Sequence, residues 1–360
     1  MKTRNKILLG AAASLLTCAG LAAGWWTQRT PDFTEDLYRK VPGLGHRIRP
    51  NLQDLEVVIP GRPHPRPFMA EDPAAVQAIS RRASYSCSTN AFGHRNGPVS
   101  GKPAPGTTRI ICLGGAITFG HGVDQGEDFP AQLQEALRPH GTFEVTNTGN
   151  PVHRVEMLAP LLERLIIPLQ PRMVIISVGV NEIAATFHGK GNESIYHPAE
   201  YESVGYFIKQ SLQMLIAKLR RKKIEAALVV PPMTSFFPYP EHRFVADQIK
   251  AAGKELKVPV FDIGTAFRER EQRDGLVLKL GGRLYRRQEL IRYRAGAARS
   301  LLVVETEPVR KQHISDRVYA YLERSGEAQA LSIDGVLPNA EGHRLIADIL
   351  ARGVLKLVRQ

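Results

Sequence analysis

Short apolar runs alternate with amphipathic segments from residue 108 to the C-terminus. Five runs have the length and composition of buried strands: Arg109–Leu113, Phe143–Asn147, Met173–Val178, Ile224–Val230 and Pro259–Asp262. The segments around them carry hydrophobic residues at helical spacing: Phe129–Leu137, Val155–Ile167, Val204–Arg221, Arg243–Leu256 and Ala340–Val358. This alternation predicts an α/β fold, a five-stranded parallel sheet with helices on both faces, whose site lies at the carboxyl ends of the strands.

Two regions do not follow this alternation of strands and helices. Residues 27–106 are dense in proline, glycine and arginine, which predicts an irregular lead-in segment with at most short strands and no core of its own. The folded domain is expected over 107–358. Within it, residues 271–330 form an arginine-rich insertion of mostly helical composition, longer than a connection needs. We expect a solvated insertion there; the alternatives are a lid or a surface for a protein partner.

The N-terminus contains a segment that predicts export. Residues 7–26 carry no charge and are long enough to cross a membrane, and Lys2, Arg4 and Lys6 precede them. These cations should keep the N-terminus in the cytoplasm and place residues 27–360 outside it, in the periplasm or at the cell surface. The segment is read as an inner-membrane anchor. A cleaved signal peptide and a lipid on Cys18 are the alternatives, and both also predict an extracytoplasmic domain.

Charge and composition limit the classes of partner and cofactor that we expect for this protein. The formal net charge is +13, most of it outside residues 1–26, so anionic partners are favoured. Basic and aromatic residues do not interleave as they do in nucleic-acid readers, so we expect no nucleic-acid partner. The histidines lack zinc-site spacing and the chain lacks phosphate-binding glycine loops, which predicts no metal and no cofactor. An exported setting permits a Cys87–Cys112 bond, although a buried strand cysteine is usually an inert hydrophobe.

Four motifs resemble the four blocks of the SGNH, or GDSL, esterase and lipase superfamily. They are GGAITFGHGVD at 114–124, NTGNP at 147–151, GVNEI at 179–183 and DGVLPNAEGHRLIA at 334–347. The stretches PGLGHRIRPN and STNAFGHRNG resemble segments that precede the domain in exported bacterial members. The resemblance implies a three-layer, flavodoxin-like SGNH hydrolase fold and an ester hydrolase ancestry.

Family members hydrolyse esters with a serine after the first strand, activated by an Asp-x-x-His pair. The serine N–H, a glycine N–H and an asparagine side chain hold the oxyanion. By resemblance, Gly149 and Asn181 match the oxyanion residues and Asp334 matches the triad acid. The nucleophile position holds Ala116 and the base position holds Leu337.

Other departures accompany these two. Gly115 stands where the family has aspartate, Glu182 follows Asn181 where aspartate is usual, and His343 matches an additional, non-catalytic histidine of the family.

The resemblance therefore implies an exported, catalytically inactive member that binds or scaffolds, with an acidic or acylated polysaccharide as the favoured ligand. The alternative is an active ester hydrolase or O-acyltransferase with a different catalytic site. Its candidate nucleophile is Thr118, and its candidate bases are His121 and His153, which follow the first two strands.

Overall fold

The computed structural model describes the chain in several stretches. They are residues 35–59, 83–97, 101–182, 198–232, 240–273, 277–280, 283–286, 303–306, 309–313, 331 and 337–358. The predicted anchor at residues 7–26 lies outside them. Among the described residues, no helix is both long and apolar enough to span a bilayer.

A five-stranded parallel sheet forms the centre of the molecule, in the order β6-β5-β7-β8-β9. Its strands are β5 (Thr108–Gly114), β6 (Phe143–Asn147), β7 (Met173–Ser177), β8 (Glu225–Val230) and β9 (Val260–Asp262). Each coincides within a residue or so with a strand predicted from the sequence. The predicted α/β class and five-stranded parallel sheet are confirmed.

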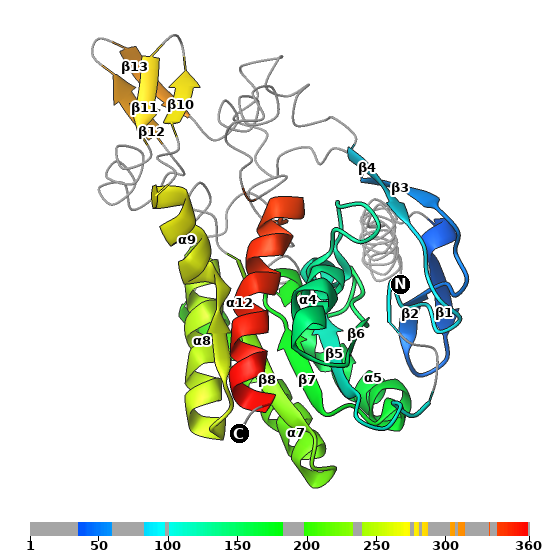
Figure 1. Cartoon of the computed structure of the whole chain (residues 1–360). Coiled ribbons are helices and arrows are strands. Elements are labelled where there is room, and N and C mark those ends of the chain that lie inside the picture. Colours follow the sequence, from blue (N-terminus) through cyan, green and yellow to red (C-terminus); the bar gives the residue numbers. More distant parts are fainter. Residues whose placement is uncertain are drawn as a thin grey trace, which may run out of the picture.

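Helices cover both faces of the sheet, which gives three layers (Figure 1). One face packs against α4 (Phe129–Leu137), α9 (Ile263–Arg273) and α12 (Ala340–Val358). The other face packs against α7 (Pro198–Arg221), α8 (Pro240–Leu256) and the helical segment between β6 and β7. Alternate residues of β5 face opposite clusters, Ile110 and Cys112 one and Ile111 and Leu113 the other, as a central strand requires.

The sequence predicts one helix between β6 and β7, but the structure has several short helical elements there. It consists of η4 (Val155–Met157), α5 (Leu158–Leu161), the π-helical η5 (Leu162–Ile166) and η6 (Ile167–Leu169). Pro160 and Pro168 lie within this segment. A proline has no N–H to donate to the preceding turn, so Pro160, in the first turn of α5, cannot bond back to η4, and Pro168, in η6, cannot bond back to η5.

The described part of the lead-in segment is more ordered than the sequence predicts. It forms two antiparallel hairpins, β1 (Tyr38–Val41) with β2 (Gly45–Ile48) and β3 (Leu55–Ile59) with β4 (Ala83–Cys87). They enclose a small hydrophobic cluster made of the buried residues Leu37, Tyr38, Ile48, Val57, Tyr85, Cys87 and Phe119. The strands are short, as the sequence predicts, and the cluster is not a core of the lead-in segment alone. The cluster is completed by Phe119, which belongs to the folded domain.

Arg95 fixes the lead-in segment to the first turn of the sheet. Its buried guanidinium donates to the carbonyls of Phe119, Gly120 and Val123, at 2.5–3.2 Å. It also lies 3.7 Å from Asp128, the N-cap of α4, whose side chain is fully buried. Burial raises the pKa of Asp128, and the Arg95 charge opposes that rise.

The insertion also differs from its prediction. Where the composition favours helices, the structure has two hairpins, β10 (Val277–Leu280) with β11 (Arg283–Arg286) and β12 (Val303–Thr306) with β13 (Val309–His313). Figure 1 shows them above the end of α9. The signal for the first was the Gly-Gly pair at 281–282, a dipeptide typical of two-residue hairpin turns.

Candidate functional site

The turn after β5 carries Ala116, the residue that the resemblance assigns to the nucleophile position. Gly115 is the N-cap of the short helix α3 (Ala116–Phe119), and Ala116 is buried at its first position. The turn packs closely on the next strand: a Cβ at Gly114 would lie 2.1 Å from the Ser177 carbonyl oxygen. An alanine methyl has no lone pair with which to attack a carbonyl carbon.

Leu337 lies just before α12, and its side chain packs against the hydrophobic core. It is half-buried and packs against the hydrophobic cluster that contains Ile117 and Phe129. Hydrocarbon there cannot accept a proton. Asp334, the predicted triad acid, lies outside the described residues.

Asn181 is the most informative residue of the site. Its amide nitrogen donates to the carbonyl oxygens of Pro151 and His153, both at 2.7 Å. An amide nitrogen has two hydrogens, so these two bonds use both. In this conformation Asn181 ties two loops together and has no N–H left for an oxyanion.

The missing side chain at Gly115 makes that conformation possible. A Cβ at Gly115 would lie 2.8 Å from the Asn181 amide nitrogen and 3.1 Å from the His153 carbonyl oxygen. The first of these is shorter than real Cβ contacts. Any residue larger than glycine at 115 would therefore displace the Asn181 amide. The substitution at 115 and the inward position of Asn181 are physically coupled.

The loop that carries Gly149 likewise uses its backbone donors internally. The Gly149 N–H donates to the Asn147 side-chain oxygen at 2.9 Å. The N–H groups of Asn150, Val152 and His153 are bonded too, to Gly114, to the Asn150 side chain and to the Asn150 carbonyl. Gly149 is glycine for a packing reason, because a Cβ there would lie 2.2 Å from the Phe119 backbone nitrogen.

Thr118 and the two candidate bases do not form a catalytic pair. The Thr118 hydroxyl is fully buried and has no hydrogen-bond partner. His121 is bonded through Nδ1 to the Tyr85 hydroxyl at 2.8 Å. His153 is buried, and its Nε2 contacts Asn150 Nδ2 and the His46 carbonyl, each at 3.1 Å. The described geometry thus provides no base for the Thr118 hydroxyl.

Glu182 and His343 are structural groups in this site. The buried Glu182 carboxylate accepts the N–H groups of Val155 and Gly179, each at 2.6 Å, so it joins the end of β7 to η4. Burial raises its pKa, and the backbone donors oppose that rise. His343 accepts the Phe129 N–H through Nδ1 at 3.1 Å and stacks on the Phe129 ring. The sequence marked Glu182 as a departure but did not indicate this bridging role.

The space beside Ala116 is too small for a substrate in the described structure. The cavity bounded by Ala116, His153, Ser177 and Asn181 has a volume of about 10 Å³. One water molecule needs roughly 10–15 Å³ by this measure, and small-molecule pockets run to roughly 300–1,000 Å³. Among the described residues, no group of three metal-ligating side chains is assembled either. Cys87 and Cys112 are both buried and free.

Three buried histidines make the fold sensitive to acid. Burial lowers the pKa of His94 and His343 to about 3 and that of His153 to about 4, and nearby arginines add to the effect. Such a histidine takes up its proton only on unfolding. The stability that it contributes is complete above about pH 6.5 and is lost as the pH falls toward the folded pKa.

The variant His343→Gln should therefore flatten the acid side of the stability profile. Between pH 4 and 6, the slope of unfolding free energy against pH should shrink by about 1.4 kcal/mol per pH unit. Urea denaturation at several pH values measures this slope. His140→Gln, at an exposed position, is the control and should leave it unchanged. An unaltered slope in His343→Gln would contradict a neutral, buried His343.

Comparison with known proteins identifies the family of this arrangement. The model of the GDSL-like Lipase/Acylhydrolase family matches residues 112–282. None of the curated proteins compared matches the chain.

Several solved structures are similar to the chain. The acetyl xylan esterase AlAXEase has 16% identity and a TM-score of 0.44, with 68% of this chain and 99% of that chain covered. A lipase/acylhydrolase from Enterococcus faecalis has 15% identity and a TM-score of 0.41, covering 69% and 95%. A GDSL-like lipase from Bacteroides thetaiotaomicron VPI-5482 has 14% identity and a TM-score of 0.39, covering 69% and 89%. At these values the likeness says nothing about substrate.

Proposed function

This chain belongs to the GDSL-like lipase/acylhydrolase family through residues 112–282, and from that premise we propose that it is an inactive member. It keeps the α/β scaffold of an ester hydrolase and uses it to bind or scaffold instead of to catalyse. Function in such a fold resides in the site rather than in the scaffold, so the reaction can be lost while the fold survives.

The observation that carries this proposal is the state of the groups that would do the chemistry. Alanine and leucine occupy the nucleophile and base positions, and both N–H groups of Asn181 are bonded to backbone carbonyls. Loss of the nucleophile or base of a catalytic triad costs on the order of 10⁶ in turnover. Loss of one oxyanion donor costs about 10²–10³ more where it acts independently. Together these losses leave no useful rate of hydrolysis.

The setting and the ligand class follow from the sequence. We place the domain outside the cytoplasm, tethered to the inner membrane through residues 7–26 or released after cleavage. The excess of Lys and Arg supports an acidic or acylated polysaccharide as the ligand. An active hydrolase built on Thr118 is the less favoured function, because the buried hydroxyl has no base beside it.

Ester turnover tests the proposal directly. The full-length protein should hydrolyse p-nitrophenyl acetate no faster than its Asp334→Ala variant, because a lone triad acid has nothing to orient. A fluorophosphonate probe, which reacts with activated hydroxyls, should leave the protein unlabelled.

Two variants identify the source of any activity. Labelling that disappears in the isosteric Thr118→Val variant and persists in Ser177→Ala would establish the alternative hydrolase. Turnover that exceeds background and falls in Asp334→Ala would contradict an inactive protein.

A further inference from the structure

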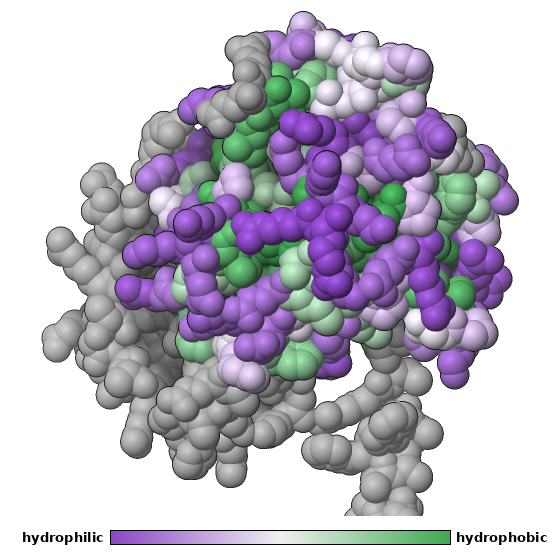
Figure 2. Space-filling view, turned by 90° about the horizontal axis from the view of Figure 1, so that it is seen from below, coloured by the Kyte–Doolittle hydropathy of each residue, from purple (hydrophilic) through white to green (hydrophobic). Residues whose placement is uncertain are grey.

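A larger hollow lies at the opposite edge of the sheet, where the strands begin. It has a volume of about 580 Å³ and is lined by residues from the ends of η6 and α7 and from the starts of β5, β7 and β8. Figure 2 views the molecule from this lower side, where hydrophilic side chains extend across patches of hydrophobic surface. Nothing in the proposed function uses this pocket.

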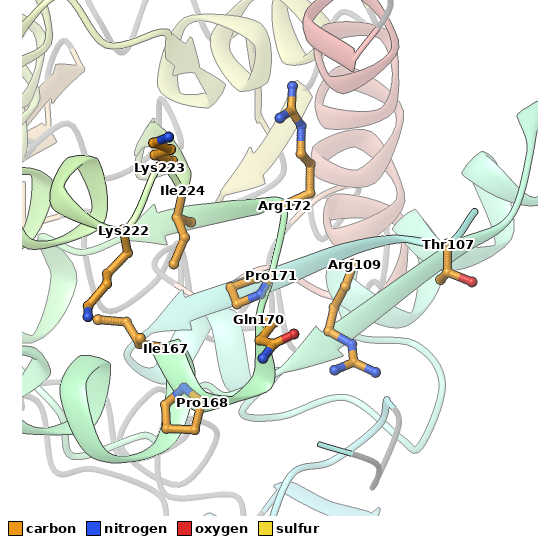
Figure 3. A pocket seen from close by; sticks show the side chains of 10 residues that line it. All are labelled: Thr107, Arg109, Ile167, Pro168, Gln170, Pro171, Arg172, Lys222, Lys223 and Ile224. Atoms are coloured by element: carbon orange, nitrogen blue, oxygen red, sulfur yellow. The ribbon is translucent and has the colours of Figure 1, made fainter. Parts of the chain in front are cut away.

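Four cationic side chains line the pocket, and two of them lack a counterion. Arg109 is paired with Glu144 at 2.8 Å, and Arg172 is paired with Glu225 at 2.6 Å. Lys222 and Lys223 have no hydrogen-bond or ion-pair partner for their ammonium groups in the described structure. Figure 3 shows Lys222 extended across the pocket toward Ile167. The pocket therefore carries two positive charges that the protein does not balance.

The backbone at two lining residues is strained in a way that glycine would relieve. Lys223 has φ of 57° and Gln170 has φ of 50°, both in the left-handed region. Lys223 follows the last turn of α7, where its N–H donates to the Arg220 carbonyl. Glycine is the usual residue at such a helix end, and a side chain there costs free energy. A long polar side chain retained at that cost indicates a use for the side chain itself.

A simpler reading is that Lys223 only balances the negative end of the α7 dipole. The chain offers a matched case for deciding between the two. Lys257, the first residue after α8, has φ of 50°, and its N–H donates to the carbonyl three residues earlier, as the Lys223 N–H does after α7, but Lys257 does not line the pocket. A dipole role would apply equally to both lysines, whereas a ligand role would apply only to Lys223.

We propose that this pocket binds a small organic phosphate, a function beyond the one proposed above. A phosphate monoester carries close to two negative charges at neutral pH, which equals the charge of the two free ammonium groups. Figure 3 shows the two lysine side chains pointing apart, and because both are exposed they are free to turn toward an anion. The monoester also offers several acceptor oxygens for the Gln170 amide, which lines the same pocket. The apolar walls made by Ile167, Pro171 and Ile224 suit the organic part, and the volume exceeds what a bare ion needs.

Calorimetric titration of the full-length protein with glucose 1-phosphate tests the proposal. Lys223→Gly should weaken binding by about tenfold or more, the usual effect of losing one charged hydrogen bond. Lys257→Gly, with the same change of charge and backbone freedom, should leave the affinity within about twofold. Neither variant should lower Tm, since glycine relieves the left-handed strain.

Each other outcome decides the matter as well. Equal weakening in Lys223→Gly and Lys257→Gly would mean diffuse surface charge and would overturn the proposal, as would a lower Tm with unchanged affinity in Lys223→Gly.

Vesicles of phosphatidylglycerol, compared with phosphatidylcholine, separate a lipid headgroup from a free phosphate. Vesicle binding that is lost only in Lys223→Gly would support the pocket with a lipid as its source. Absence of saturable binding to both probes overturns it.

Discussion

Replacing Arg95 with leucine is expected to lower the free energy of unfolding by about 3–5 kcal/mol. The substitution leaves the Asp128 carboxylate buried without its cation and removes the donor from several carbonyls around α3. An unpaired charge and unsatisfied carbonyls in the interior are among the most costly defects that a fold can carry. Urea denaturation followed by circular dichroism measures the loss.

Two further variants separate charge pairing from general disruption. Arg138→Leu removes an exposed arginine that pairs with Glu135, and its effect should stay within about 0.5 kcal/mol. Arg95→Leu combined with Asp128→Asn should recover part of the stability, because the carboxylate charge is then gone. A loss below about 1 kcal/mol in Arg95→Leu alone would show that the buried pair does not hold the lead-in segment to the domain.

Rebuilding the catalytic residues is expected to restore hydrolysis only when position 115 is rebuilt too. Ala116→Ser with Leu337→His supplies a nucleophile and a base but leaves Asn181 bonded to Pro151 and His153. Adding Gly115→Asp places a Cβ against the Asn181 amide and displaces it from these carbonyls. The triple variant should therefore exceed the double variant by about 10²–10³ in kcat on p-nitrophenyl acetate, the effect of one oxyanion donor.

A variant with Gly115→Ala in place of Gly115→Asp tests the steric explanation. Alanine carries the same Cβ and no carboxylate, so it should give most of the same gain. If the double variant is already as active as either triple variant, Asn181 is not held inward by the absence of a side chain at 115.

The strands and most helices could be predicted because hydrophobic periodicity reports which face is buried. The match is closest at Phe129–Leu137 and Ala340–Val358, whose bounds agree with α4 and α12. It fails where another effect dominates. The apolar spacing over 155–167 is unaffected by Pro160, although this proline removes a backbone donor from the helix. The hairpins at 277–286 and 303–313 are specified by turns and pairing that composition does not reveal.

The candidate site, too, could be predicted from the sequence only in part. Residue identities at 116 and 337 are visible in the sequence, and they predict the loss of nucleophile and base. The direction in which Asn181 points is not visible, because it depends on the space left by Gly115 and on two carbonyls from the loop after β6. The motif position of Gly149 predicts an oxyanion donor, whereas its contacts show a packing role against α3 and an N–H bonded to Asn147.

The hydrophobic cluster of the lead-in hairpins constrains how the sequence of this protein can change in evolution. Phe119 closes that cluster and is also the last residue of α3, the helix that carries Ala116. A mutation that changes the packing of either the hairpins or the turn is therefore expected to change the packing of the other. Because the two segments share Phe119, the hairpins are poorly suited to exchange between relatives as a separable module, and their sequence is expected to change together with that of the turn.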